Sequence, residues 1–84
     1  MKEKTTRTMI IGGSSGMGLA TARLLLKENI SVLIAGRSRE RLEDARKSLG
    51  SDQVDIFVAD LGDRSQVANL FGHAGRIDHV VVTA

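Results

Sequence analysis

The sequence predicts an α/β fold, a doubly wound parallel sheet of the Rossmann type, from three observations. Four short apolar runs are continuous rather than alternating with polar residues, which is typical of strands buried on both faces. Segments of helical length separate these runs, and their apolar positions recur at three and four residues. Because the connections are short, strand and helix alternate, and right-handed crossovers then predict the strand order 3-2-1-4.

The first half of the chain carries two expected strands with one helix between them. The apolar runs at residues 9–11 and 32–35 are the strands. The helix is expected from about residue 16 to residue 28. Asn29 follows it and is expected to end it in the left-handed conformation.

The second expected helix is bounded by a cap at each end. Ser38 is an N-cap residue, and Gly50 ends the helix. Its apolar positions are Leu42, Ala45 and Leu49. The third expected strand follows at residues 56–59.

The third expected helix carries the clearest apolar stripe in the chain. Asp63, with Gln66 three residues later, resembles a capping box at its start, and Gly75 ends it. The stripe consists of Val67, Leu70, Phe71 and Ala74. The fourth strand is expected at residues 80–82.

Length and charge exclude several classes of function. The 84 residues allow one domain with a modest core. The net charge of +2 is small, and Phe57 and Phe71 are the aromatic residues that could stack on bases, so no nucleic-acid partner is expected. The sequence has no cysteine, which excludes a disulfide framework and a thiolate metal site.

The N-terminus and the histidines are interpreted as structural. The stretch MKEKTTR is polar and no apolar signal segment follows it, so a cytoplasmic protein without a membrane segment is expected. Residues 1–6 are expected to be a flexible tail, and residues 2–7 to be solvated. No group of residues has metal-ligand spacing, so no metal site is predicted, and His73 and His79 are read as structural.

The stretch IIGGSSGMGLA places a cluster of glycines between the first strand and the first helix. A helix start offers free N–H groups and a positive dipole end, and a pyrophosphate can reach them where no Cβ intrudes. The alternative is a tight turn without a ligand, since glycine also serves where φ is positive. Met17 is also expected to pack in the helix core. The candidate cofactor-binding residues of this turn are Gly12, Ser14, Ser15, Gly16, Met17 and Gly18.

The glycine spacing, Gly-x-x-x-Gly-x-Gly, resembles that of the short-chain dehydrogenase/reductase family. The Thr-Gly-x-x-x-Gly-x-Gly motif of that family falls on residues 11–18, with Ile11 in place of the threonine that ties the turn down. The resemblance covers almost the whole chain and implies the Rossmann-type fold and a dinucleotide cofactor.

Two further stretches carry the same resemblance. Asp60 and Leu61 match a pair that in the family lies near the adenine ring, although Asp60 is alternatively a turn residue that caps the next segment. Residues 77–84 match the approach to the family's Asn-Asn-Ala-Gly motif. Val82 and Thr83 replace the two asparagines, and Ala84 fits the motif.

The end of the second strand favours NADP over NAD. A carboxylate there would bind the free 2′-hydroxyl of NAD, but this chain has an uncharged residue followed by Arg37, a multi-donor partner for a phosphate. Ser38 is included in this candidate site. The alternative is that Arg37, Arg39 and Arg41 form the solvated start of a helix, and Arg39 and Arg41 are read as surface residues that pair with Glu43 and its neighbours.

The chain offers no residue for the chemistry that the resemblance implies. The family transfers hydride with a tyrosine in a Tyr-x-x-x-Lys motif and a serine, and this sequence contains no tyrosine. No catalytic residue is therefore assigned, and the 84 residues alone are expected to be inactive. We expect them to be the N-terminal, NADP-binding half of a longer oxidoreductase that acts on a carbonyl or alcohol, with an incomplete sheet.

Two alternatives stay open at this point. One is a separate nucleotide-binding or self-associating module, a homo-oligomer formed through the exposed edge of the fourth strand. The other is a methyltransferase-type nucleotide fold, against which Gly36 and Arg37 argue, because that class needs a carboxylate at the end of the second strand.

Overall fold

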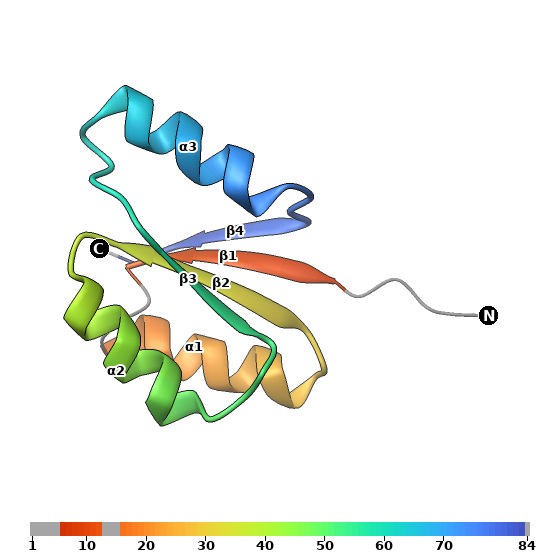
Figure 1. Ribbon diagram of the computed structural model, residues 1–84. Helices are drawn as coiled ribbons and strands as arrows, with labels where there is room; N and C mark the ends of the chain where they lie inside the picture. Colours follow the sequence, from red (N-terminus) through yellow and green to blue (C-terminus); the bar gives the residue numbers. More distant parts are fainter. Residues whose placement is uncertain (1–5, 13–15, 84) are drawn as a thin grey trace.

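A computed structural model describes residues 6–12 and 16–83 of the chain. It contains one parallel sheet with the strand order β3-β2-β1-β4, which confirms the predicted doubly wound arrangement (Figure 1). The elements in chain order are β1 (Arg7–Ile11), α1 (Gly16–Lys27), β2 (Ser31–Gly36), α2 (Arg39–Leu49), β3 (Val54–Val58), α3 (Arg64–Ala74) and β4 (His79–Val82). The strands β1 and β3 each begin two residues before the apolar runs suggested. The polar Arg7 and Thr8 join the ladder at the start of β1, and Val54 joins it at the start of β3, ahead of the polar Asp55.

Helices cover both faces of the sheet. Figure 1 shows α1 and α2 on one face and α3 on the other. Successive residues of β1 separate accordingly, since Met9 packs in the cluster with Leu70 of α3, and Ile10 packs in the cluster with Ala22 and Leu42 of α1 and α2. All five of these side chains are fully buried. Burial on both faces explains why the runs are continuously apolar.

The predicted helix ends are confirmed where a local signal determines them. The Ser38 hydroxyl accepts the Arg41 backbone N–H at 3.2 Å. Gly50 and Asn29 both adopt left-handed conformations, with φ of 60° and 63°. These three caps depend on residues adjacent in the chain, so sequence spacing alone locates them.

The capping box at α3 forms in one direction. The Asp63 carboxylate accepts the Ser65 and Gln66 backbone N–H groups at 2.9 and 3.4 Å. The Gln66 side chain does not return to the Asp63 N–H. Its Oε1 accepts the Asp60 N–H at 2.7 Å, while the Asp63 N–H donates to the Asp60 carbonyl at 3.0 Å. Gln66 thus fixes the loop after β3.

The expectation that residues 2–7 form a solvated tail is wrong for Arg7. This residue begins β1, and its guanidinium donates to the Ala74 carbonyl at 2.7 Å and lies 3.5 Å from the Asp55 carboxylate. The Thr6 carbonyl also accepts the Ser31 N–H at 3.1 Å. Residues 1–5 lie outside the described part of the chain. Hydrogen bonds to β2 and α3 therefore fix the start of β1.

The apolar stripe of α3 is buried against the sheet only in part, which differs from the prediction. Leu70 and Ala74 are buried, but Phe71 is 46% exposed. His73, interpreted from the sequence as structural, has its Nε2 2.9 Å from the Asp55 carboxylate, and its ring lies against Phe57 at a tilt. In residues 6–12 and 16–83, no helix is long and apolar enough to cross a membrane.

Candidate cofactor site

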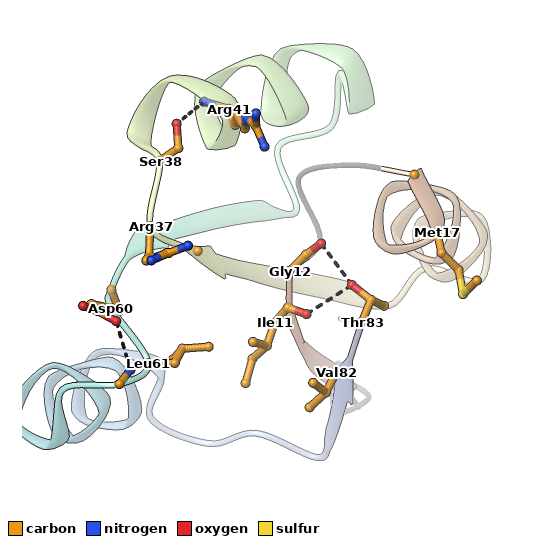
Figure 2. A pocket seen from close by; sticks show the side chains of 14 residues that line it. Ile11, Gly12, Met17, Arg37, Ser38, Arg41, Asp60, Leu61, Val82 and Thr83 are labelled. Carbon is orange, nitrogen blue, oxygen red and sulfur yellow. Dashed lines mark hydrogen bonds between the residues drawn. The ribbon is translucent and has the colours of Figure 1, made fainter.

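A cavity of about 1100 Å³ lies at the carboxyl ends of the strands, where loops from all four strands meet (Figure 2). Parallel strands bring their carboxyl ends to one edge, and the strand order reverses between β1 and β4, so this is the expected ligand position in such a sheet. The predicted cofactor-binding residues that line it are Gly12, Gly16, Met17, Arg37, Ser38, Asp60 and Leu61.

Four predicted site residues do not appear in the lining. Gly18 is buried in α1 rather than on the cavity wall. Ser14, Ser15 and Ala84 lie outside the described residues. Met17 does line the cavity, but the expectation that it packs in the helix core is wrong, because its side chain is 77% exposed. It stands at the first turn of α1, on the side away from the sheet (Figure 2).

The two glycines that bound the turn lack a side chain for different reasons. Gly12 has a φ of +86°, and a Cβ there would overlap the Thr83 carbonyl oxygen and lie 2.9 Å from the Thr83 Oγ1. Gly16 has a φ of +47°, and a Cβ there would meet no atom of the described residues within 4 Å. The protein itself therefore occupies the space beside Gly12, whereas the space beside Gly16 is open to a ligand.

Thr83 connects the end of β4 to the start of the glycine turn. Its backbone N–H donates to the Ile11 carbonyl at 2.9 Å. Its hydroxyl lies 3.2 Å from the Ile11 carbonyl oxygen and 3.0 Å from the Gly12 carbonyl oxygen (Figure 2). Sequence reasoning noted Thr83 as a replacement for an asparagine and did not place it in the site, because a contact between strand ends 71 residues apart has no local signal.

Two arginines line the cavity where β2 ends and α2 begins. Arg37 follows β2, and Arg41 lies in the first turn of α2, whose cap is Ser38. Within the described ranges, neither guanidinium pairs with a carboxylate, while Arg39 lies 3.9 Å from Glu43.

Arg41 is exposed, as expected of a surface residue, but it also lines the cavity, which the sequence did not indicate. The signal that could have identified it is its place in the first turn of α2, three residues after the N-cap Ser38. A helix that follows the carboxyl end of a parallel strand brings its first turn to the edge of the sheet where ligands bind.

The loop after β3 supplies an acidic and an apolar residue. The Asp60 carboxylate accepts the Gly62 N–H at 3.0 Å, so the side chain acts as a turn residue and also lines the cavity. Leu61 is 39% exposed and presents an apolar surface beside it. The two readings of Asp60, turn residue and site residue, are therefore compatible.

Two carboxylates have lowered pKa values, and the groups that lower them are not part of the cavity lining. Hydrogen bonds from the Ser65 hydroxyl and from the Gln66 and Ser65 N–H groups lower the pKa of Asp63 from its ordinary 3.8. A hydrogen bond from the Arg7 N–H, together with the Arg76 guanidinium, lowers the pKa of Asp78. Over the described ranges, no three His, Cys, Asp or Glu side chains gather in a way that could hold a metal ion.

Comparison with known proteins identifies the family of the fold. The family described as short chain dehydrogenase matches residues 6–84. An uncharacterized oxidoreductase from Staphylococcus haemolyticus is 36% identical over 81 residues, which cover 87% of this chain and 35% of that protein. A 3-dehydrosphinganine reductase from Arabidopsis thaliana is 38% identical over 82 residues, which cover 94% of this chain and 25% of that protein.

Solved structures agree with the sequence matches. A short chain dehydrogenase/reductase family protein superposes with a TM-score of 0.88 at 36% identity, covering 100% of this chain and 35% of that one. An actinorhodin polyketide ketoreductase, solved with NADPH, superposes with a TM-score of 0.80 at 29% identity, covering 95% of this chain and 33% of that one. The chain thus spans a quarter to about a third of the length of the relatives named above.

Proposed function

The chain belongs to the short-chain dehydrogenase family, and from this premise we propose that its cavity binds the adenosine and pyrophosphate part of NADP. The observation that carries the proposal is the position of Arg37 and Arg41, which line one cavity together with the glycine turn. NADP carries a phosphate on the 2′-oxygen of its adenosine ribose and a pyrophosphate on the 5′-oxygen, so its site needs a cationic group and a backbone anion site in the same cavity.

The arginines support NADP rather than NAD. A carboxylate at the end of β2 would accept the 2′-hydroxyl of NAD and repel a 2′-phosphate, and this chain has Gly36 and Arg37 there. A guanidinium offers several donors in one plane to the phosphate oxygens. The NADPH in the similar ketoreductase structure supports the same choice.

The glycine turn suits the pyrophosphate. The helix α1 starts at Gly16, so its first N–H groups and positive dipole end face the cavity. The open space beside Gly16 leaves this backbone accessible to an anion. Ser14 and Ser15, outside the described residues, stay part of the proposal as hydroxyl donors to phosphate, and Ala84 stays part of it by resemblance. Asp60 and Leu61 would lie beside the adenosine.

We propose that the whole protein is an NADP-dependent oxidoreductase acting on a carbonyl or alcohol. The cofactor, when bound, supplies or accepts a hydride. The residues of this chain bind and orient it, and they include no tyrosine that could move a proton in the family's way. The 84 residues alone are therefore expected to bind the cofactor without turnover. The cytoplasmic location expected from the sequence belongs to this proposal.

Titration calorimetry with NADP and NAD tests the proposal. The protein should bind NADP at least about tenfold more tightly than NAD, because a charged hydrogen bond contributes about 1.5–3 kcal/mol. Arg37→Ala should remove most of this preference and leave the affinity for NAD unchanged. Equal or tighter binding of NAD by the unaltered protein would contradict it, and S-adenosylmethionine should not bind.

Self-association is a second candidate function that one observation favours. The strand β4 lies at an edge of the sheet, and Val80 and Val82 on it are 48% and 68% exposed. An exposed apolar edge strand can pair with the same strand of another copy. Sedimentation equilibrium of the 84-residue chain distinguishes the two, because a stable dimer without affinity for either cofactor would favour the interaction module.

A further inference from the structure

We propose that Thr83 is a positioning residue whose hydroxyl fastens the first residue of the glycine turn to the end of β4. The inference rests on the proposed function, because the turn is the backbone that would receive the pyrophosphate. It goes beyond that function by assigning the fixed position of Gly12 to one side chain at the end of the neighbouring strand β4.

The hydrogen bonds of Thr83 extend the sheet past its last paired residues. Strand pairing between β1 and β4 ends at Ile11 and Val82. The Thr83 N–H continues the ladder by donating to the Ile11 carbonyl at 2.9 Å, and the hydroxyl then reaches the next carbonyl, that of Gly12, at 3.0 Å. The hydroxyl has one hydrogen, which the Ile11 carbonyl at 3.2 Å shares. A side chain thus supplies a bond where the backbone ladder ends.

Gly12 is held from both sides as a result. Its N–H donates to the Ala35 carbonyl of β2 at 3.0 Å, and its carbonyl accepts from Thr83 beside β4. The absent Cβ leaves the space in which Thr83 sits. With its N–H bonded to β2 and its C=O bonded to Thr83, Gly12 has hydrogen bonds on both of its backbone groups before any ligand arrives.

The residues at the ends of β1 and β4 explain why the hydroxyl comes from Thr83. Ile11, at the end of β1, offers no polar side-chain atom, and neither does Val82 opposite it. Thr83 is therefore the residue at this junction that can donate from a side chain to the turn. A turn fixed in advance lowers the entropy that binding must remove, so the effect of the hydroxyl should appear in affinity for a ligand with a pyrophosphate.

Amide hydrogen exchange of the ligand-free protein tests the positioning role directly. Thr83→Val keeps the shape and removes the hydroxyl, and Thr83→Ala removes it in a second way. The local opening that frees the Gly12 amide from the Ala35 carbonyl would then no longer have to break the bond from the Thr83 hydroxyl. Both variants should therefore speed exchange of the Gly12 amide by about fivefold, the effect of one lost hydrogen bond. Thr83→Ser keeps the hydroxyl and should keep the protection. A serine variant that exchanges as fast as the valine variant would overturn the proposal.

Ser31→Ala is the matched control. It removes a hydroxyl that donates to the Thr6 carbonyl at 3.4 Å, where the other end of β1 meets β2. Exchange at Gly12 should not change in this variant, and circular dichroism should report folded protein in all of them. Faster exchange at Gly12 in Ser31→Ala, or unchanged exchange in both Thr83→Val and Thr83→Ala, would overturn the proposal.

Binding measurements separate this inference from the proposed function. Thr83→Val should weaken NADP by about fivefold and leave adenosine 2′-monophosphate, which lacks the pyrophosphate, unchanged. Arg37→Ala should weaken both ligands. Equal weakening of both by Thr83→Val would overturn the role of Thr83 in the turn. Failure of the unaltered protein to bind either ligand would overturn the proposed function, while the exchange rates would still decide the role of Thr83.

Discussion

The carbonyl oxygen of Thr83 occupies the space that a side chain on Gly12 would need. These residues are far apart in the chain, but β1 and β4 are adjacent in the sheet, so their ends meet beside the cavity. Gly12 also has a φ of +86°, which L residues with a side chain rarely adopt. Two independent physical reasons therefore require glycine at the start of the turn, and neither depends on a ligand.

Gly12→Ala should destabilise the protein. The left-handed conformation costs about 1–2 kcal/mol for a residue with a Cβ, and displacing a packed neighbour adds about 1–3 kcal/mol. We expect a loss of about 2–5 kcal/mol in the free energy of unfolding, measured by urea denaturation.

Gly72→Ala is the matched control for this substitution. Gly72 lies in α3, where a Cβ would meet no atom within 4 Å in the part of the chain that the structure describes. Alanine favours a helix over glycine by about 0.5–1 kcal/mol, so this variant should gain stability. A similar loss in the two variants would show that the contact between Gly12 and Thr83 is not the cause.

Arg41→Ala should weaken NADP by about tenfold and leave NAD unchanged, because the guanidinium lines the cavity beside Arg37. Arg39→Ala is the control, since Arg39 pairs with Glu43 and is absent from the lining. Calorimetric titration of both variants with both cofactors measures the difference. Equal effects of the two substitutions on NADP would assign the preference to the general charge of α2 instead.

The sequence predicted those parts of the molecule that local chemistry determines. Ser38, Gly50 and Asn29 bound their helices as expected, because a cap depends on neighbours in the chain. The strand order followed from the alternation of elements. Gln66 was assigned the wrong partner, because two N–H groups lie within its reach and the shape of the loop after β3 decides between them.

The sequence indicated the glycine turn of the site, but it did not indicate that this turn contacts the end of β4. Glycine spacing located the turn whose ends line the cavity, and Arg37, predicted as a site residue, lines it at the end of β2. The contact of Thr83 with that turn depends on which strands are neighbours and how far each extends, so no motif encodes it. Met17 was expected in the core because it is apolar, but its position on the outer side of α1 exposes it.

Asp63→Ala should lower the melting temperature at neutral pH and have little effect in strong acid. The carboxylate caps α3, and its hydrogen bonds lower its pKa in the folded state below the ordinary 3.8 of the unfolded chain. Its contribution is therefore fully present above pH 3.8 and is lost as the pH falls through the folded-state pKa.

Thermal melts of both proteins across this pH range measure the Asp63 effect. The difference in melting temperature should narrow below pH 3.8. Asp63→Asn serves as control, because asparagine caps a helix without titrating, so its difference from the unaltered protein should change with pH in the same sense. A difference that stays constant down to strong acid would exclude the ionised carboxylate as the cause.

Leu70→Ala should reduce the free energy of unfolding by about 2–5 kcal/mol, because truncating a buried leucine removes apolar contacts and leaves a cavity. Leu70 is fully buried between α3 and the sheet. Leu24→Ala is its control, since Leu24 on α1 is 64% exposed and should change stability by less than about 0.5 kcal/mol. Urea denaturation followed by circular dichroism measures both. Similar losses would contradict the assignment of α3 as the cover of its face, and with it the support that α3 gives to the Asp60 loop at the cavity.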